Sequence, residues 1–248
     1  MDSGLYTAYS GLKATASALD VVANNLANVN TTGFKSDETF LRIYNKAVAD
    51  PKAGPLDGAL NDSTLVRGSV SNFNPGVMKT TGNPLDVAID GDGFLAVEGP
   101  GGVYYTRNGN LHTNANGQLV TVEGYTVLGA GGAIQVPPGR ISISQAGEIQ
   151  VDGAVVDTLR VVDFRDKRSL QKVGNSLFRN NGAEGVELEG AEKHIHQGAL
   201  EQSNVNPVKE MMLMIDIMRQ FESLQKTIFT MMNTVNDRSI NQVGRVIG

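Results

Sequence analysis

The sequence contains no cysteine, and this absence excludes several kinds of site. Disulfide bonds, thiolate metal sites and a cysteine nucleophile all need that residue. No run of about eighteen apolar residues is present either, so we predict no direct insertion into a membrane. The N-terminal stretch MDSGLYTAYSG lacks both a basic leader and a continuous apolar core, so we expect no cleaved signal peptide. Any export of this chain would then use a route that does not read such a signal.

Aromatic residues are sparse as well, and the net charge is not basic. Aromatics make up 6% of the 248 residues, tryptophan is absent, and the formal net charge is −5. Because nucleic-acid-binding proteins usually present a basic face, we predict no nucleic-acid partner. Hydrophobic residues at 40% and charged residues at 19% are close to the average of globular proteins, and 29 glycines indicate many tight turns.

Leucines recur every seven residues near the N-terminus, at Leu5, Leu12, Leu19 and Leu26. Smaller apolar residues such as Val22 lie three or four positions further on, which predicts a helix with a heptad-like stripe. Gly33 is expected to end this helix in a left-handed conformation. The same stretch carries Asn24, Asn25 and Asn28. Asparagine is uncharged and has both a donor and an acceptor, so it suits a seam between helices.

A second apolar stripe lies near the C-terminus. Pro207 follows Asn206 and fits the first position of a helix. Apolar residues then alternate spacings of three and four, with one polar break at Gln225: Met211, Met214, Met218, Phe221, Ile228, Met232 and Val235. Leu213, Ile217, Leu224 and Met231 add a second apolar face. A helix that is apolar on more than one side needs more than one neighbour.

The middle of the sequence reads as short strands. From Thr80 onward, alternating runs lie between glycine and asparagine turns: LDVAI, FLAVE, VYYT, LHTN, QLVTV, YTVLG, AIQV, RISIS, EIQV and LRVVDF. Because Asn-Gly tolerates positive φ, RNGN (107–110) and NANGQ (114–118) are predicted hairpin turns. IDGDGF (89–94) is also expected to be a hairpin turn, since the spacing of a calcium loop fails there. Residues 48–68 show no clear period and predict a linker or an extended arm.

These patterns predict an α+β fold. Long N- and C-terminal helices pair as a coiled-coil-like layer, and the central domain is mainly antiparallel β. We expect a helical assembly segment at residues 1–33, a linker or arm at 34–79, the β domain at 80–200 and a second helical assembly segment at 201–248. The two helices carry more apolar surface than one antiparallel pair covers, which favours burial against neighbouring chains. The alternative is an intramolecular helical hairpin packed on the β domain.

No motif predicts catalysis, a cofactor or a metal site. His194 and His196 form an H-x-H pair, but a full ligand set would need carboxylates, because His112 is the only other histidine. The stretch LGAGGA (128–133) lacks the dinucleotide and P-loop patterns, and no G-x-S-x-G elbow exists. We therefore predict that the protein is not an enzyme. A monomeric β-domain adhesin or binding module is the alternative of a different class.

Three separated segments resemble signatures of the flagellar rod and hook axial proteins. NNLANVNTTGFK (24–35) resembles the N-terminal signature of that family. TGNPLDVAIDGDGFLAVE (81–98) and YTRNGNLHTNANGQLVT (105–121) resemble its central signature, and GALEQSNVNPVKEMMLMIDIMRQFE (198–222) its C-terminal signature. The length and the single β domain are similar to those of rod members rather than the longer hook subunit. Among these, the proximal rod position adjoining the distal rod is favoured, and the distal rod is second.

The resemblance implies a structural subunit of the basal-body rod, which crosses the periplasm. Members of the family assemble with copies of themselves and with other proximal and distal rod proteins into a tube. The tube transmits torque and encloses the export channel. The flagellar type III export apparatus delivers the subunits through an uncleaved N-terminal segment. The predicted assembly interface consists of both stripes and the asparagines: Leu5, Leu12, Leu19, Val22, Asn24, Asn25, Leu26, Asn28, Met211, Met214, Met218, Phe221, Ile228, Met232 and Val235.

Overall fold

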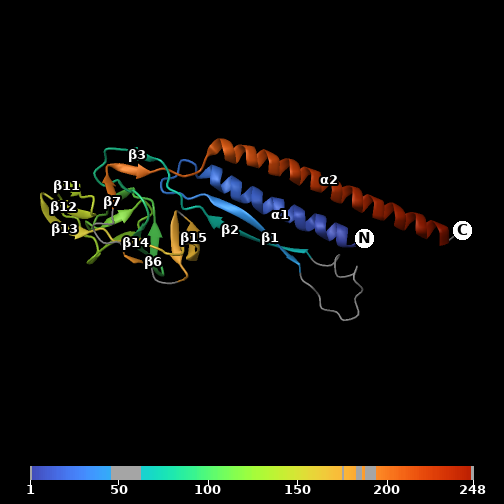
Figure 1. The fold of residues 1–248 in the computed structure, drawn as a ribbon, viewed down its shortest axis with the longest axis horizontal. Helices are drawn as coiled ribbons and strands as arrows, with labels where there is room; N and C mark the ends of the chain where they lie inside the picture. The colour runs from blue at the N-terminus through green and yellow to red at the C-terminus, as the bar shows by residue number, and fades with distance from the viewer. Residues whose placement is uncertain (1, 46–62, 175, 183–185, 188–193, 247–248) are drawn as a thin grey trace. The chain divides into compact units, whose positions relative to one another are not determined.

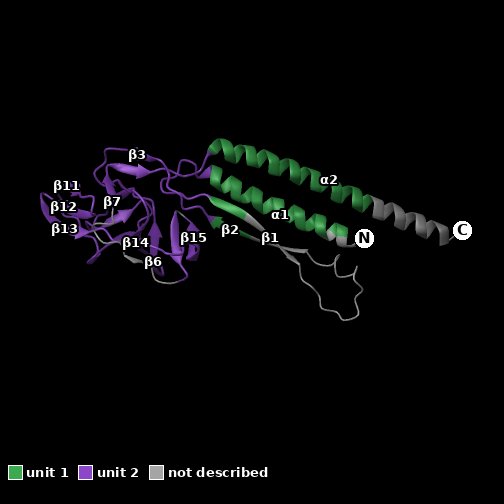
Figure 2. Ribbon diagram, in the orientation of Figure 1, with its two compact units in different colours: residues 1–26, 37–70, 207–248 green, residues 27–36, 71–206 purple. Residues whose placement is uncertain are grey.

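The chain folds into two compact units in a computed structural model that describes residues 2–45, 63–174, 176–182, 186–187 and 194–246. Figure 2 shows both units. Residues 1–26, 37–70 and 207–248 form one, which we call the helical unit. Residues 27–36 and 71–206 form the other, which we call the β unit. The chain therefore passes between the units after residues 26, 36, 70 and 206.

The helical unit contains the two long helices and one small sheet (Figure 1). The helices are α1 (Asp2–Ala27) and α2 (Pro207–Val246), and the strands β1 (Asp37–Asn45) and β2 (Ser63–Ser71) pair in a two-stranded sheet. α2 begins at Pro207, the position predicted from the sequence. The two helices contact each other where Gly11 faces Leu224, since a Cβ at Gly11 would lie 3.6 Å from Leu224 Cδ1.

One feature of these elements differs from the sequence prediction, the end of α1. In the stretch 48–68, predicted as a linker or an extended arm, residues 63–68 belong to strand β2, and residues 48–62 lie outside the described residues. α1 ends at Ala27, before Gly33, because a turn follows in which Thr31 donates to Asn28. The Thr31 hydroxyl bonds the Asn28 Oδ1 at 3.1 Å, a side-chain contact that competes with helical hydrogen bonding. Gly33 does adopt the predicted left-handed conformation, with φ of 65°.

The β unit is built from short strands and one 3₁₀ turn at Lys167–Ser169. The strands are β3 (Met78–Thr80), β4 (Val87–Ile89), β5 (Phe94–Gly99), β6 (Gly102–Thr106), β7 (Leu111–Thr113), β8 (Leu119–Thr121), β9 (Thr126–Gly129), β10 (Gly132–Ala133), β11 (Ile141–Ile143), β12 (Glu148–Val151), β13 (Ala154–Thr158), β14 (Val161–Asp163), β15 (Leu170–Gly174), β16 (Leu177–Asn180), β17 (Val186–Glu187), β18 (Ile195–Gln197) and β19 (Ala199–Glu201).

The strands pair antiparallel, which confirms the predicted mainly antiparallel β domain. Within the described residues, the largest sheet has ten strands and runs β15-β16-β6-β5-β9-β8-β7, with β10 beside β9 and β14 between β5 and β17. A three-stranded sheet has the order β11-β12-β13, and two pairs complete the unit, β18 with β4 and β19 with β3.

One of the three predicted hairpin turns is confirmed. NANGQ joins β7 to β8, which pair directly. RNGN is not a hairpin turn, because it joins β6 to β7, and β6 pairs with β5 and β16 instead. IDGDGF is not one either, because it joins β4 to β5, and these belong to different sheets. The two segments are connected by hydrogen bonds from the Arg107 side chain of RNGN to the main chain of IDGDGF.

Strand β5 is buried on both of its faces. Leu95 and Val97 join a larger apolar cluster that includes Val87, Leu111 and Ile149. Because successive side chains of a strand point to opposite faces, the intervening residues of β5 pack elsewhere. They join a smaller cluster whose members are Phe94, Ala96, Leu128, Val162, Phe164, Leu170 and Phe178. The β unit thus contains its own hydrophobic core. Across the described residues, neither helix is long and apolar enough to cross a membrane.

Candidate functional site

The predicted stripe on α1 is only partly covered within the helical unit. Val22 is buried, whereas Leu5 is exposed. Leu12, Leu19 and Leu26 are half-buried. The stripe therefore keeps apolar surface that a further helix can contact.

The three asparagines of this stripe have different surroundings. Asn24 is exposed, Asn28 is half-buried, and Asn25 is buried. Asn25 Nδ2 donates to the Asp37 carbonyl oxygen at 2.9 Å, and the Asp37 N–H donates to Asn25 Oδ1 at 2.9 Å. The Asn25 amide is thus used inside the chain, where it fixes the start of β1. A role for it between chains remains a prediction.

α2 exposes large apolar side chains on more than one face. Three of the predicted contact residues are exposed, namely Met211, Met218 and Met232. Three more are half-buried, namely Met214, Phe221 and Ile228. The side chain of Val235 lies outside the described residues. The second face is exposed at Met212, Leu213, Ile215, Phe229 and Met231.

A groove of about 650 Å³ lies between the two helices of the helical unit. Leu12 lines it from α1, and the α2 side is formed by Gln225, Lys226, Ile228, Phe229, Thr230 and Met232. Leu12, Ile228 and Met232, predicted to belong to one interface, do come together here. Gln225, the polar break of the second stripe, lies in the same wall.

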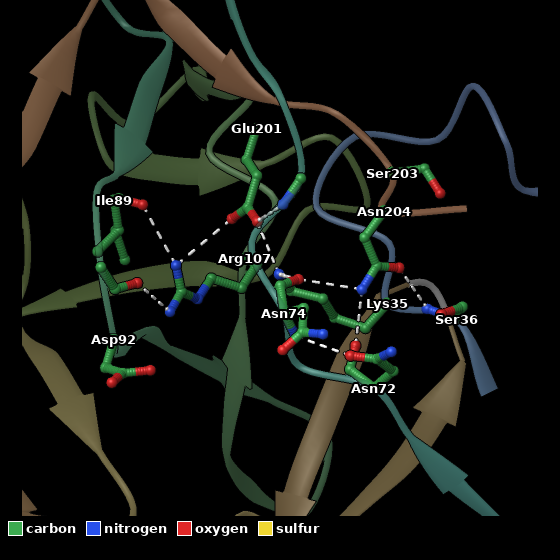
Figure 3. A network of polar contacts seen from close by, with 12 residues as sticks. Lys35, Ser36, Asn72, Asn74, Ile89, Asp92, Arg107, Glu201, Ser203 and Asn204 are labelled. Atoms are coloured by element: carbon green, nitrogen blue, oxygen red, sulfur yellow. Dashed lines mark hydrogen bonds and ion pairs between the residues drawn. The ribbon is translucent and has the colours of Figure 1, made fainter. Parts of the chain in front are cut away.

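Three charged side chains are buried inside the β unit (Figure 3). Lys35 Nζ lies 2.6 Å from Glu201 Oε1, and Arg107 Nη1 lies 3.4 Å from Glu201 Oε2. The side chains of Lys35 and Glu201 are 1% and 2% exposed. We call these three residues the charge triad. Because two cations share one carboxylate, the triad carries a formal net charge of +1, from two positive charges and one negative.

The Lys35–Glu201 half of the triad also binds the segment before β3. Lys35 Nζ donates to the Asn74 carbonyl oxygen at 2.9 Å, and the Gly76 N–H donates to Glu201 Oε1 at 2.8 Å. Both buried charges thus have main-chain partners as well as each other, which offsets part of the cost of removing them from water.

The Arg107 half of the triad holds the segment between β4 and β5. Arg107 Nη1 donates to the Ile89 carbonyl oxygen at 3.2 Å, and Nη2 donates to the Gly91 carbonyl oxygen at 2.7 Å. The guanidinium lies 5.1 Å from the centroid of the Phe94 ring. This is why RNGN and IDGDGF form no hairpins: the side chain of the first binds the main chain of the second.

Asn204 joins three segments beside the triad. The Ser36 N–H donates to Asn204 Oδ1 at 2.8 Å. Asn204 Nδ2 donates to the carbonyl oxygens of Asn72 at 2.8 Å and Asn74 at 3.0 Å. The Asn72 N–H in turn donates to the Ser36 carbonyl oxygen at 2.7 Å. The segments around residues 36, 72 and 204 are all next to the points where the chain passes to the helical unit.

Gly33 brings the segment after α1 into close contact with the main chain of Arg107 and Asn108, directly after β6. A Cβ at this position would lie 2.4 Å from the carbonyl carbon of Arg107, so only glycine fits. The Gly33 N–H donates to the Glu201 carbonyl oxygen at 2.8 Å. The neighbouring Thr32 hydroxyl donates to Asn108 Oδ1 at 2.7 Å. Residues 32–35 are therefore packed as part of the β unit.

Burial lowers the pKa of both cations of the triad. Loss of hydration lowers the pKa of the Lys35 amine below its usual range, and attraction to Glu201 opposes this only in part. Burial likewise lowers the pKa of the Arg107 guanidinium, although arginine stays protonated at physiological pH. At the surface, a hydrogen bond from Lys167 lowers the pKa of Asp92.

The H-x-H pair lies at the surface of the β unit. His196 Nε2 is 3.6 Å from Asp90 Oδ2, across the paired strands β18 and β4. Among the described residues, no group of three or more histidine, aspartate or glutamate side chains is placed to hold a metal ion.

Comparison with known families gives one consistent result along the chain. The family described as "Flagella basal body rod protein" matches residues 5–35. The "Flagellar hook protein FlgE/F/G D1 domain" matches residues 88–151, and the "Flagellar basal body rod FlgEFG protein C-terminal" matches residues 196–239.

Whole-length relatives agree with these matches. Flagellar basal-body rod protein FlgF of Caulobacter vibrioides is 37% identical, over 99% of this chain and 98% of its own length. The chain belongs to the family of flagellar basal-body rod proteins. FlgG of Bacillus subtilis is 34% identical over 91% of this rod protein and 94% of its own length, and FlgF of Salmonella typhimurium is 37% identical over 92% and 93%. Membership supports assembly with other flagellar rod proteins as a structural component of the basal body.

Each of the three matched segments of this rod protein contributes one residue to the charge triad. Lys35 ends the first segment, Arg107 lies in the second, and Glu201 lies in the third. Sequence reasoning missed all three residues, because Lys35 and Glu201 are 166 positions apart and Arg107 and Glu201 are 94 apart. The only available signal was that each is a charged residue inside a segment resembling a family signature.

Proposed function

We propose that this rod protein polymerises into a tubular drive shaft that crosses the periplasm, transmits torque and encloses the export channel. Its partners are copies of itself and other proximal and distal rod proteins, and its role is structural rather than catalytic. The observation that carries the proposal is the apolar surface of α2, where Met218 is 47% exposed and Phe229 is 69% exposed. Burial of each such side chain is worth about 1.5–3 kcal/mol, so helices of neighbouring subunits that cover this surface stabilise the polymer.

The same surface supports coiled-coil-like pairing between subunits. Leu5, Leu12 and Leu19 of α1 follow a seven-residue repeat, and they keep accessible apolar surface after α1 has met α2. The groove between Leu12 and Met232 has room for apolar side chains from a third helix. In this arrangement each helix meets one partner in its own chain and further partners in neighbouring chains, as its two apolar faces require.

Within the rod, we propose the proximal position that adjoins the distal rod. The Asn206-Pro207 pair after SNV and the shorter region between the central and C-terminal signature segments, residues 122–197, support this choice. Cryo-electron microscopy of intact basal bodies that carry a tagged copy of this chain tests the proposal. Density for the tag below the distal rod supports the proximal position, density in the distal rod favours the second choice, and absence from the rod contradicts the proposed function.

Delivery by the flagellar type III export apparatus through an uncleaved N-terminal segment is part of the same proposal. The match of residues 5–35 to the flagellar rod family supports this route. Mass spectrometry of the subunit from purified basal bodies should therefore recover peptides that begin within the first few residues. A subunit that lacks its first turns in the assembled rod would contradict this route.

A further inference from the structure

We propose that the charge triad is a clamp that orders the connections to both terminal helices before the subunit is assembled. Three segments lead from the β unit to the helical unit, namely residues 27–36, 71–76 and 201–206. The triad and Asn204 bind all three to one another. The inference rests on the proposed function for its purpose, because a subunit that assembles through both helices needs their starting points to be fixed in one place.

The contacts of the clamp involve both ends of the terminal segments. Glu201 receives Lys35 through its carboxylate and the Gly33 N–H through its carbonyl oxygen, at 2.6 and 2.8 Å. The segment that follows α1 is thus bound directly to the strand that precedes α2. Lys172 also contacts the segment that follows α1. Its Nζ donates to the Lys35 carbonyl oxygen at 2.7 Å and lies 3.7 Å from the centroid of the Phe34 ring.

The clamp is part of the β unit and does not need the helices of neighbouring subunits. Every residue that forms it belongs to residues 27–36 or 71–206, and the side chains of the triad are buried there. Part of the N-terminal family segment, residues 27–35, is therefore a component of the β domain and not of the assembly helix. We infer that this part is ordered in the free subunit, whatever the state of α1.

Net charge decides which substitution opens the clamp. Glu201→Gln keeps the shape but removes the one carboxylate that contacts both cations, so the net charge of the triad rises from +1 to +2. Lys35→Met leaves Arg107 and Glu201 as a neutral pair. Removing one partner of a buried ion pair is strongly destabilising when it leaves an uncompensated charge. Glu201→Gln should therefore open the clamp, and a second substitution, Lys35→Met, should partly restore it.

Hydrogen exchange of the full-length monomer tests the clamp. In the wild type, the amides of Gly33, Ser36 and Gly76 should be protected, since each donates within the clamp. Glu201→Gln should speed their exchange by about a hundredfold or more while the amides of β5 stay protected. The double variant should recover part of the protection. Glu123→Gln, the same substitution at an exposed position just after β8, is the matched control and should change nothing at these amides.

Three results would overturn the clamp: unprotected Gly33 and Ser36 amides in the wild-type monomer, a loss in Glu201→Gln that is equal over the whole β unit, or no recovery in the double variant. Motility of cells that carry each variant separates this from the proposed function. If the rod role is correct, Glu201→Gln abolishes motility and the control Glu123→Gln does not. If the rod role is wrong, motility is unaffected by every variant while the exchange results still decide whether the clamp exists.

Discussion

The side chain of Lys35 is buried although an amine loses its hydration in the chain interior. The penalty is several kcal/mol per ion, and apolar residues of similar volume often give equal stability. The charges instead make the packing geometry specific, because Lys35 Nζ needs the acceptors that Glu201 and Asn74 provide. An apolar side chain at position 35 has no such requirement. The charge triad therefore specifies how the segment after α1 packs more than it strengthens the fold.

The lowered pKa of Lys35 predicts how its contribution to stability varies with pH. Between that pKa and the usual lysine value of about 10.4, the unfolded chain holds a proton that the folded chain has released. The contribution of Lys35 to the free energy of unfolding is therefore largest above the usual lysine pKa. It decreases as the pH falls from that value to the lowered pKa of the folded state. Urea unfolding should show the difference between wild type and Lys35→Met increasing with alkaline pH. A difference that falls would mean that Glu201 raises this pKa.

Gly33 offers a second test at the residue scale. Alanine at this position would adopt a left-handed φ and also place a Cβ 2.4 Å from the Arg107 carbonyl carbon. Gly82 has a similar φ of 77° but nothing within 4 Å of an added Cβ, so Gly82→Ala measures the backbone strain alone. We expect Gly33→Ala to reduce the free energy of unfolding of the β unit by about 1–3 kcal/mol more than Gly82→Ala does. Equal losses would show that the segment after α1 is not tightly packed on β6.

At the scale of elements, α2 exposes many large apolar side chains that its own chain does not cover. Met218 lies on the predicted stripe, and Gln220, two residues further on, is exposed and polar. Met218→Asp and Gln220→Asp add the same charge to the same helix, but only the first places it where a neighbouring helix is proposed to pack. An unpaired charge buried in that contact is costly.

We therefore expect Met218→Asp to abolish swimming motility and Gln220→Asp to preserve it. Neither should change the free energy of unfolding of the β unit by more than about 0.5 kcal/mol, because both are exposed substitutions away from its core. Soft-agar motility and thermal unfolding of the purified chains give the two measurements. Equal loss of motility in both variants would count against the predicted stripe as the interface.

The local sequence pattern predicted the helices and strands better than it predicted which of them pair or contact each other. The two helices, most of the strands and the NANGQ hairpin follow from spacing and turn residues alone. Several strands were missed, among them β3, β13, β15, β16, β18 and β19. β3 and β19 have only three residues each and pair between Thr80 and Ala199. RNGN failed for a related reason: Asn-Gly signals a turn correctly, but the Arg107 side chain enters the interior and binds a different loop. Contacts between residues this far apart leave no local spacing to read.

On the scale of the whole molecule, the first and third family segments each have two roles. Their outer parts, in the helices α1 and α2, expose apolar surface that the chain itself does not cover. Their inner parts, at Lys35 and Glu201, meet Arg107 of the second segment inside the β unit. In such a subunit the β unit can fold alone, because it contains its own core. The helices bury their apolar surface only when neighbouring subunits bind.

This separation predicts that the terminal helices are only marginally stable in the free subunit. Isolated helices gain little without tertiary contacts, because nucleation is unfavourable. Gly4 and Gly11 weaken α1 further, and in α2 Glu210 is the only buried residue between positions 207 and 233. A mobile terminus suits passage through an export channel, and it delays polymerisation until several contacts form at once. Both helices should therefore fold fully only against neighbouring subunits.

Limited trypsin digestion measures this directly. In a verified monomer, cleavage should occur first after Lys13 in α1 and after Arg219 and Lys226 in α2, because trypsin needs a locally unfolded chain. The same bonds should resist cleavage in purified basal bodies. Lys79, exposed on β3 of the β unit, is the internal control and should be cut slowly in both states. If Arg219 and Lys226 resist trypsin in the monomer as well as Lys79 does, the helices are already formed before assembly, and folding on assembly is wrong.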